Sequence, residues 1–105
     1  MKTIWTEQAI QDWQRIADYI FEHFGEQALL KFQKETIEQE TNVTNFPNSG
    51  KLLLSNRRTK YTFRRLSVGK LSLMVYHVDS EIIYIDIFWG TRQSPKRLRE
   101  RLSEV

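Results

Sequence analysis

Residues 61–89, YTFRRLSVGKLSLMVYHVDSEIIYIDIFW, decide the fold of this chain. The stretch contains three runs rich in β-branched and aromatic residues, at 61–68, 71–78 and 81–89. Two-residue links, Gly69-Lys70 and Asp79-Ser80, separate the runs. Runs of this composition joined by tight links are typical of neighbouring antiparallel strands. The stretch therefore predicts a three-stranded antiparallel meander.

The predicted turns also fix which side chains share a face of the sheet. Two-residue links would place Val68 opposite Leu71 and Val78 opposite Glu81. Side chains alternate between faces, and the face expected to pack on helices holds Tyr61, Phe63, Arg65, Met74, Tyr76, Val78, Ile83, Ile85, Ile87 and Trp89. The opposite face holds Arg64, Leu66, Val68, Leu71, Leu73, Val75, His77, Ile82, Tyr84, Asp86 and Phe88. This second face is apolar with a few polar groups, which predicts a groove for a ligand or peptide.

The residues before the meander predict two helices joined at Gly25. Apolar residues in the first recur with the spacing of an amphipathic helix, at Ala9, Trp13, Ile16, Ala17, Ile20 and Phe24. Thr6 suits its N-cap, and Gly25 suits a left-handed residue after its end. A weaker apolar stripe predicts the second helix over residues 26–44. We expect a short strand at residues 3–5 and a loop over residues 51–60.

Ser94 and Pro95 are typical of a helix start, so a short basic helix is expected after the meander. The sequence thus predicts an α+β fold. It comprises a short N-terminal strand, an antiparallel helix hairpin packed on a three- to four-stranded antiparallel sheet, and a short basic C-terminal helix. A length of 105 residues suits a single domain over 1–105.

The composition excludes several classes of site. The chain has no cysteine, and therefore no disulfide, thiolate zinc ligand or cysteine nucleophile. It contains no Walker loop, zinc-ligand spacing or Ser-His-Asp constellation, so we expect no metal and no cofactor. No apolar run approaches the roughly 20 residues that span a bilayer, and the first residues lack the apolar stretch of a signal peptide. These features predict a cytoplasmic protein without a membrane partner.

The charge is unevenly distributed along the chain. Residues 1–50 carry four basic and eight acidic side chains, a net charge of −4. Residues 51–105 carry twelve basic and five acidic side chains, a net charge of +7. A strongly basic half favours contact with a polyanion such as nucleic acid, the ribosome or an acidic protein.

From residue 5 to about 98, the chain resembles the RelE/ParE family, the toxins of bacterial type II toxin–antitoxin pairs. The matching segments are WTEQA at 5–9, DWQRIADYI at 12–20, FGEQA at 24–28, FPNSG at 46–50, FRRL at 63–66, VYHV at 75–78 and TRQSP at 91–95. The resemblance implies a small toxin that an antitoxin keeps silent. RelE-like members cleave messenger RNA in the ribosomal A site, whereas ParE-like members inhibit DNA gyrase and are not nucleases.

RNA cleavage needs a base, an acid and cations that stabilise the phosphorane charge. The resemblance implies Arg64 and Arg92 as catalytic residues, and Tyr61 is the candidate general acid. The residues expected to bind phosphate or RNA are Arg57, Arg58, Lys60, Arg65, Lys96 and Arg97. One departure counts against a nuclease: no histidine or tyrosine follows Arg92, where RelE-like nucleases often carry one.

Several of these residues also have structural interpretations. Arg64 would pair with Asp86 if the two share a sheet face, and Arg92 would bond backbone carbonyls where the last strand ends. His77, in the middle of a strand, is more typical of a hydrogen-bonded structural residue than of a base. The basic helix after Ser94 is equally compatible with a solvated face.

The sequence narrowly favours a growth-inhibiting toxin of the plasmid-stabilisation type that acts as an RNA-binding mRNA interferase on the ribosome. The alternatives are a non-catalytic inhibitor of DNA gyrase and a degenerate member that only binds its antitoxin. Whether the protein is an enzyme therefore stays open, as does a homodimer formed through the second sheet face.

Overall fold

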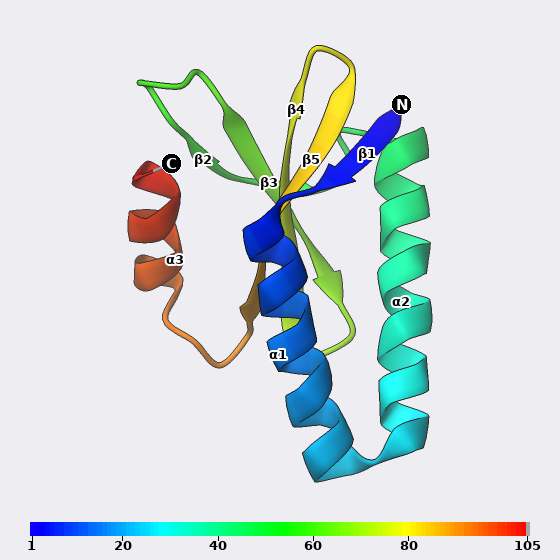
Figure 1. Cartoon of the computed structure of the whole chain (residues 1–105). Helices are drawn as coiled ribbons and strands as arrows, with labels where there is room; N and C mark the ends of the chain where they lie inside the picture. The colour runs from blue at the N-terminus through cyan, green and yellow to red at the C-terminus, as the bar shows by residue number, and fades with distance from the viewer. Residues whose placement is uncertain (105) are drawn as a thin grey trace.

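The computed structural model describes residues 1–104, which form five strands and three helices (Figure 1). In chain order these are β1 (Lys2–Trp5), α1 (Glu7–Phe24), α2 (Glu26–Asn45), β2 (Lys51–Ser55), β3 (Thr62–Val68), β4 (Ser72–Asp79), β5 (Ile82–Gly90) and α3 (Pro95–Ser103). The strands form one sheet in the order β1-β5-β4-β3-β2. β1 runs parallel to β5, and all other neighbours are antiparallel. The predicted α+β class is confirmed, with five strands in the sheet rather than three or four.

The helix hairpin covers one face of the sheet, as predicted (Figure 1). Thr6 caps α1, since its Oγ1 accepts a hydrogen bond from the Ala9 backbone N–H at 3.1 Å. Gly25 separates the two helices with φ of +89°, a conformation that favours glycine. Trp13 of α1 stacks on Phe32 of α2 with ring centroids 5.2 Å apart. The cap, the glycine between the helices and the contact between Trp13 and Phe32 all support the hairpin, whose two helices share the core beneath them.

The expected loop over residues 51–60 is wrong in its first half, because Lys51–Ser55 forms the edge strand β2. Leu52 pairs with Arg64 of β3, and the pairing shifts between Leu52 and Leu54. Three consecutive leucines give no alternation of apolar and polar residues. The strand therefore exists through its pairing with β3, which the local sequence does not display.

Both predicted turn registers differ from the structure. Val68 pairs with Ser72, one residue beyond the predicted partner. Val78 pairs with Ile83, two residues beyond, because the turn lies at Ser80-Glu81. These turn residues have φ of +53° and +65°, the left-handed conformation of a type I′ turn. The sequence lacks the Asn-Gly pair that usually announces such a turn.

A slip of one residue exchanges the two faces of a strand, whereas a slip of two does not. β3 is therefore turned over relative to the prediction. Leu66 and Val68 face the helix hairpin, while Tyr61 and Phe63 lie on the opposite face. Arg65 shares that opposite face, where it lines a cleft beneath α3.

A β-bulge at Asp86 reverses the second half of β5. Ile85 pairs with Tyr76 and Ile87 pairs with Val75, so Asp86 is an extra residue without an opposite partner. Strict alternation predicts Ile87 on the same face as Ile85, and this prediction is wrong. Ile87 and Trp89 follow the bulge, and they lie on the sheet face opposite the helix hairpin rather than on the predicted face.

α3 covers part of the second sheet face with its own small core. Leu98 and Leu102 of α3 are buried, and they pack with Phe63, Val75, Ile87 and Trp89. Phe88, by contrast, belongs to the core under the helix hairpin. α3 therefore covers part of the expected groove, and a cleft remains between this helix and the sheet. No helix within residues 1–104 is long and apolar enough to cross a membrane.

Candidate functional site

The fully buried carboxylate of Asp12 joins α1, β5 and α3. It accepts hydrogen bonds from the Phe88 backbone N–H at 3.3 Å and from Gln8 Nε2 at 2.8 Å. It also forms ion pairs with Arg15 and Arg101, each at 3.3 Å. β1 pairs only with the first half of β5, so Asp12 supplies an acceptor to the part of the β5 edge that β1 does not cover. The carboxylate thus holds three elements together.

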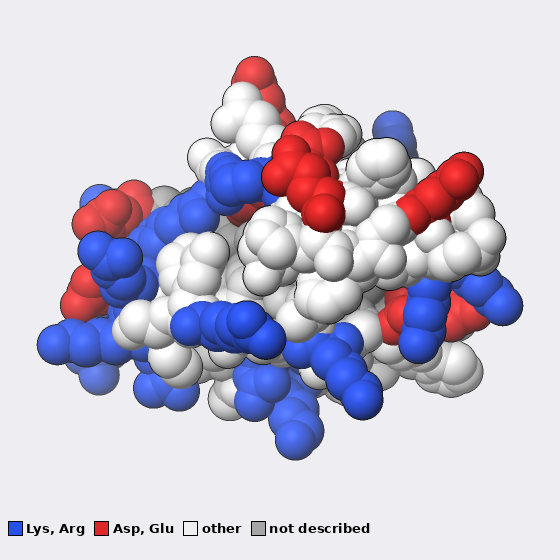
Figure 2. All heavy atoms as spheres, turned by 90° about the horizontal axis from the view of Figure 1, so that it is seen from below, with Lys and Arg blue, Asp and Glu red and all other residues white. Residues whose placement is uncertain are grey.

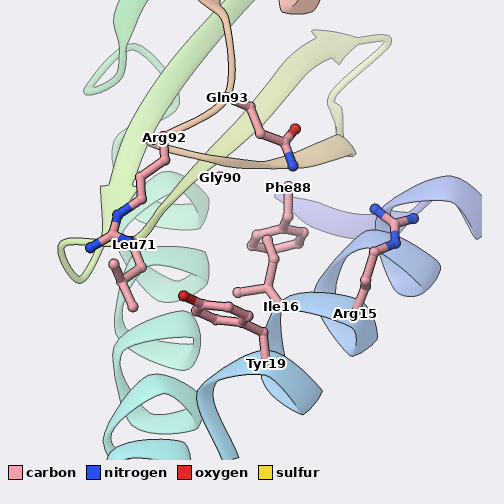
Figure 3. A pocket seen from close by; sticks show the side chains of 8 residues that line it. All are labelled: Arg15, Ile16, Tyr19, Leu71, Phe88, Gly90, Arg92 and Gln93. Atoms are coloured by element: carbon pink, nitrogen blue, oxygen red, sulfur yellow. The ribbon is translucent and has the colours of Figure 1, made fainter. Parts of the chain in front are cut away.

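A pocket of about 290 Å³ opens between α1 and the C-terminal end of β5 (Figure 3). It is lined by Arg15, Ile16, Tyr19, Leu71, Phe88, Gly90, Arg92 and Gln93. Ile16 and Phe88 form an apolar wall, and the guanidinium groups of Arg15 and Arg92 lie on opposite sides of the pocket (Figure 3). This arrangement suits an apolar group that lies next to a negative charge.

Arg92 itself is exposed, and within residues 1–104 it makes neither a hydrogen bond nor an ion pair. The expected bonds to backbone carbonyls at the end of the last strand are therefore not formed. A free guanidinium at the mouth of a pocket is available to an external anion.

Arg64 has a structural role on the helix-hairpin face of β3. Its Nη1 donates to the Gly50 carbonyl at 3.0 Å. The hydroxyl of its neighbour Tyr76 accepts from the Gly50 N–H at 2.9 Å and donates to the Pro47 carbonyl at 2.8 Å. The two side chains hold the turn after α2 against the sheet. The expected ion pair with Asp86 is wrong, because the register slip places the two residues on opposite faces.

Asp86 pairs instead with His77, with Oδ2 and Nδ1 2.6 Å apart. The imidazole is stacked between the rings of Tyr61 and Tyr84, with centroids 4.1 and 5.1 Å away. Burial raises the pKa of Asp86 above its usual value, although the hydrogen bond and charge of His77 act in the opposite direction. The pair is enclosed by its own sheet, which supports a structural histidine rather than a base.

The three residues expected to cleave RNA lie apart. Arg64 faces the helix hairpin, and Tyr61 lies on the other face of the sheet. Arg92 follows β5, at the opposite end of the sheet from Tyr61. An acid, a base and a cation must converge on one phosphate to cleave RNA, and this set does not converge.

The predicted phosphate-binding residues fall into two groups. Arg57, Arg58 and Lys60 are exposed in the loop between β2 and β3, while Arg65, Lys96 and Arg97 lie at or near α3. Figure 2 shows Lys and Arg side chains gathered on the side of the molecule that carries α3. The basic half of the sequence thus forms a basic surface on the folded molecule.

The sequence contains a signal for Asp12 that its helical position reveals. Asp12 falls between Ala9 and Trp13 on the apolar stripe of α1, and a charged residue at such a position is usually paired. Tyr19 lines the pocket and Trp89 packs under α3 through contacts that are distant in sequence, and the sequence gives no comparable signal for them. Within residues 1–104, no group of three or more His, Asp or Glu side chains is placed to hold a metal ion.

Comparison with known proteins gives a consistent result. The model of a family described as "ParE toxin of type II toxin-antitoxin system, parDE" matches residues 3–95. A solved structure, "Chromosomal ParDE TA system from P. aeruginosa", is similar in fold, with a TM-score of 0.65 and 22% sequence identity. The similarity covers 86% of this chain and 95% of that chain. A search of curated proteins found no significant match.

Proposed function

Because the chain belongs to the ParE toxin family of type II toxin–antitoxin systems, we propose that it is the toxin of such a pair and acts by binding DNA gyrase without cleaving RNA. Gyrase is the target that the ParE-like branch of the family implies. The observation that carries the choice is the separation of Arg64, Tyr61 and Arg92.

Each of the three has a setting that favours a non-catalytic role. Arg64 is committed to the Gly50 carbonyl. The ring of Tyr61 lies against His77, and within residues 1–104 the tyrosine hydroxyl forms no hydrogen bond to another side chain or to the backbone. Arg92 remains free, and the pocket beside it is lined by neither Arg64 nor Tyr61. Binding by a surface, rather than chemistry at a phosphate, is what this arrangement supports.

The basic surface near α3 is the proposed contact with the target. Arg92, Lys96 and Arg97 are exposed on the loop after β5 and the first turn of α3. Exposed basic side chains of this kind speed association with a partner of opposite charge, and they make the association depend on salt concentration. The partner that silences the toxin is an antitoxin, which would cover this surface or a neighbouring one.

Controlled expression in a bacterial host tests the proposal. Messenger RNA 5′ ends, DNA-damage signalling and growth are followed together, and the purified protein is added to a gyrase supercoiling assay. We expect filamentation, damage signalling, inhibited supercoiling and intact ribosome-bound messages. A triple Arg92→Gln, Lys96→Gln, Arg97→Gln variant should lose most of the inhibition.

Tyr61→Phe is the variant that separates the two mechanisms. It removes only a hydroxyl for which the fold supplies no partner, so the protein should fold normally. A gyrase-binding toxin keeps its toxicity in this variant, whereas a nuclease that uses Tyr61 as general acid loses it. New 5′ ends in ribosome-bound messages, abolished by Tyr61→Phe, would refute the proposal and establish the nuclease.

A further inference from the structure

A cleft of about 400 Å³ separates α3 from the sheet. It is lined by Leu53, Arg65, Ser67, Leu73, Trp89, Gly90, Thr91, Gln93, Pro95, Leu98 and Arg99. Trp89 is only 8% exposed, and its indole Nε1 has no hydrogen-bond partner among the residues that the structure describes. A buried donor without an acceptor is costly and rare in folded proteins. Trp89 thus brings to the lining of the cleft a buried indole N–H for which the described residues supply no acceptor.

Two guanidinium groups add to this excess of donors. Arg65 from β3 and Arg99 from α3 both line the cleft, and within residues 1–104 neither guanidinium group has an ion-pair or hydrogen-bond partner. No aspartate or glutamate is among the lining residues. An indole N–H and two unpaired guanidinium groups together select an anion that accepts several hydrogen bonds.

The rest of the lining decides which kind of molecule carries that anion. Leu53, Leu73, Leu98 and Pro95 give the cleft apolar walls. A nucleic-acid backbone offers phosphates but no aliphatic group to fill such walls, whereas a peptide offers a carboxylate beside an apolar side chain. The mixture of cations and leucines therefore favours a protein ligand.

We propose that this cleft binds an acidic segment of the antitoxin, with an Asp or Glu carboxylate that accepts from Trp89 Nε1–H and pairs with Arg65 and Arg99. An apolar side chain next to that carboxylate fills the space between Leu53, Leu73 and Leu98. This inference rests on the proposed function only in that it takes the antitoxin as the occupant. The cleft lies beside the basic surface that is proposed to contact gyrase, so its occupant would block that surface.

The first test measures the affinity of the purified toxin for the antitoxin encoded beside it, by isothermal titration calorimetry. Trp89→Phe keeps an aromatic ring and removes the N–H, and it should weaken binding about 10- to 100-fold through loss of a bond to a charged acceptor. Its stability should change little, because loss of the unpaired donor and loss of ring area act in opposite directions. The double variant Arg65→Gln, Arg99→Gln should weaken binding at least about tenfold and flatten its salt dependence.

Trp13→Phe is the matched control, because the Trp13 indole already donates to Thr36 Oγ1 at 2.9 Å. This variant should lower the midpoint of urea unfolding and leave the affinity unchanged. The Trp89 indole resonance in ¹H–¹⁵N spectra, assigned by its absence in Trp89→Phe, should move downfield when the antitoxin binds. Substitution of each antitoxin Asp or Glu by its amide should identify one residue whose effect disappears in Trp89→Phe.

The outcomes separate this inference from the proposed function. A tight complex whose affinity is the same for the wild-type protein, Trp89→Phe and the double arginine variant would overturn the cleft and leave the toxin–antitoxin pair intact. No complex with the wild-type toxin would overturn both. If Trp89→Phe weakens binding of a 12-nucleotide single-stranded RNA but not of the antitoxin, the cleft is a nucleic-acid site and the inference is wrong.

Discussion

Substitution of Asp12 by asparagine should cost this small protein a large part of its stability. The amide has nearly the shape of the carboxylate, but it has no charge and only one acceptor oxygen. Its NH2 group would face donors on Gln8, Arg15, Arg101 and the Phe88 backbone, all of which the carboxylate now accepts. At least one buried donor is then left unpaired.

The separate contributions give the size of the effect. Arg15 is 64% exposed and close along the helix, so its pair with Asp12 contributes only about 0.3–0.5 kcal/mol. Arg101 is 31% exposed, and its pair contributes about 1 kcal/mol. The loss of one buried bond to a charged acceptor costs about 1.5–3 kcal/mol. We therefore expect a decrease of about 3–4 kcal/mol in the free energy of unfolding, out of a total of about 5–15 kcal/mol.

Urea unfolding, followed by far-UV circular dichroism and tryptophan fluorescence, measures this change. In thermal unfolding the same loss should lower Tm by about 12–25 °C. Asp18→Asn is the matched control, because Asp18 lies on the exposed side of α1 and also accepts from a glutamine four residues earlier, at 2.9 Å. Its cost should stay below about 0.5 kcal/mol. If Asp12→Asn falls within 1 kcal/mol of this control, the carboxylate does not hold the three elements together and the reasoning is wrong.

Three further predictions concern other parts of the sheet. Asp86→Asn should stabilise the protein at neutral pH, because burial raises the pKa of Asp86 and its ionisation opposes folding. As the pH falls from the raised pKa of folded Asp86 toward the ordinary aspartate pKa of 3.8, protonation of Asp86 stabilises the wild-type protein. The advantage of the variant should therefore fade over that pH window in urea titrations, and a constant difference would contradict the assignment. Gly50→Ala should lower the free energy of unfolding by about 1–3 kcal/mol, because the new Cβ would lie 2.7 Å from the Tyr76 hydroxyl and 3.0 Å from the Arg65 carbonyl. An unchanged thermal unfolding curve would show that the turn relaxes freely. Glu81→Gly should raise Tm by a few degrees, because Glu81 has a left-handed backbone conformation with φ of +65°, which glycine adopts without strain. A lower Tm in the variant would exclude strain at this turn.

The helices and the central strands could be predicted because their signals are local. The apolar stripe of α1, the cap at Thr6 and the Ser94-Pro95 start of α3 each depend on a few neighbouring residues. Element order and the resemblance to a toxin family followed from the same segments. The fold class was therefore available from the sequence.

The sheet faces could not be predicted, because they depend on one-residue details of backbone geometry. The left-handed pair Ser80-Glu81 carries no turn signature, and the bulge at Asp86 has no glycine to mark it. The candidate site depended on those faces. Arg64 lies on a strand, as expected, yet the register decides that it meets the Gly50 carbonyl rather than Asp86.

The pairing of β1 with β5 also has a consequence for how the protein is made. β1 is the first strand in the chain and β5 the last, and Lys2 pairs with Ile82. During translation β1 must wait for a partner that is synthesised about 80 residues later, and that long loop makes closure of the sheet a late event. α3 and the basic surface depend on β5 in turn. A nascent chain therefore has no complete sheet until nearly all of residues 1–90 have left the ribosome, and the surfaces that depend on β5 are completed last.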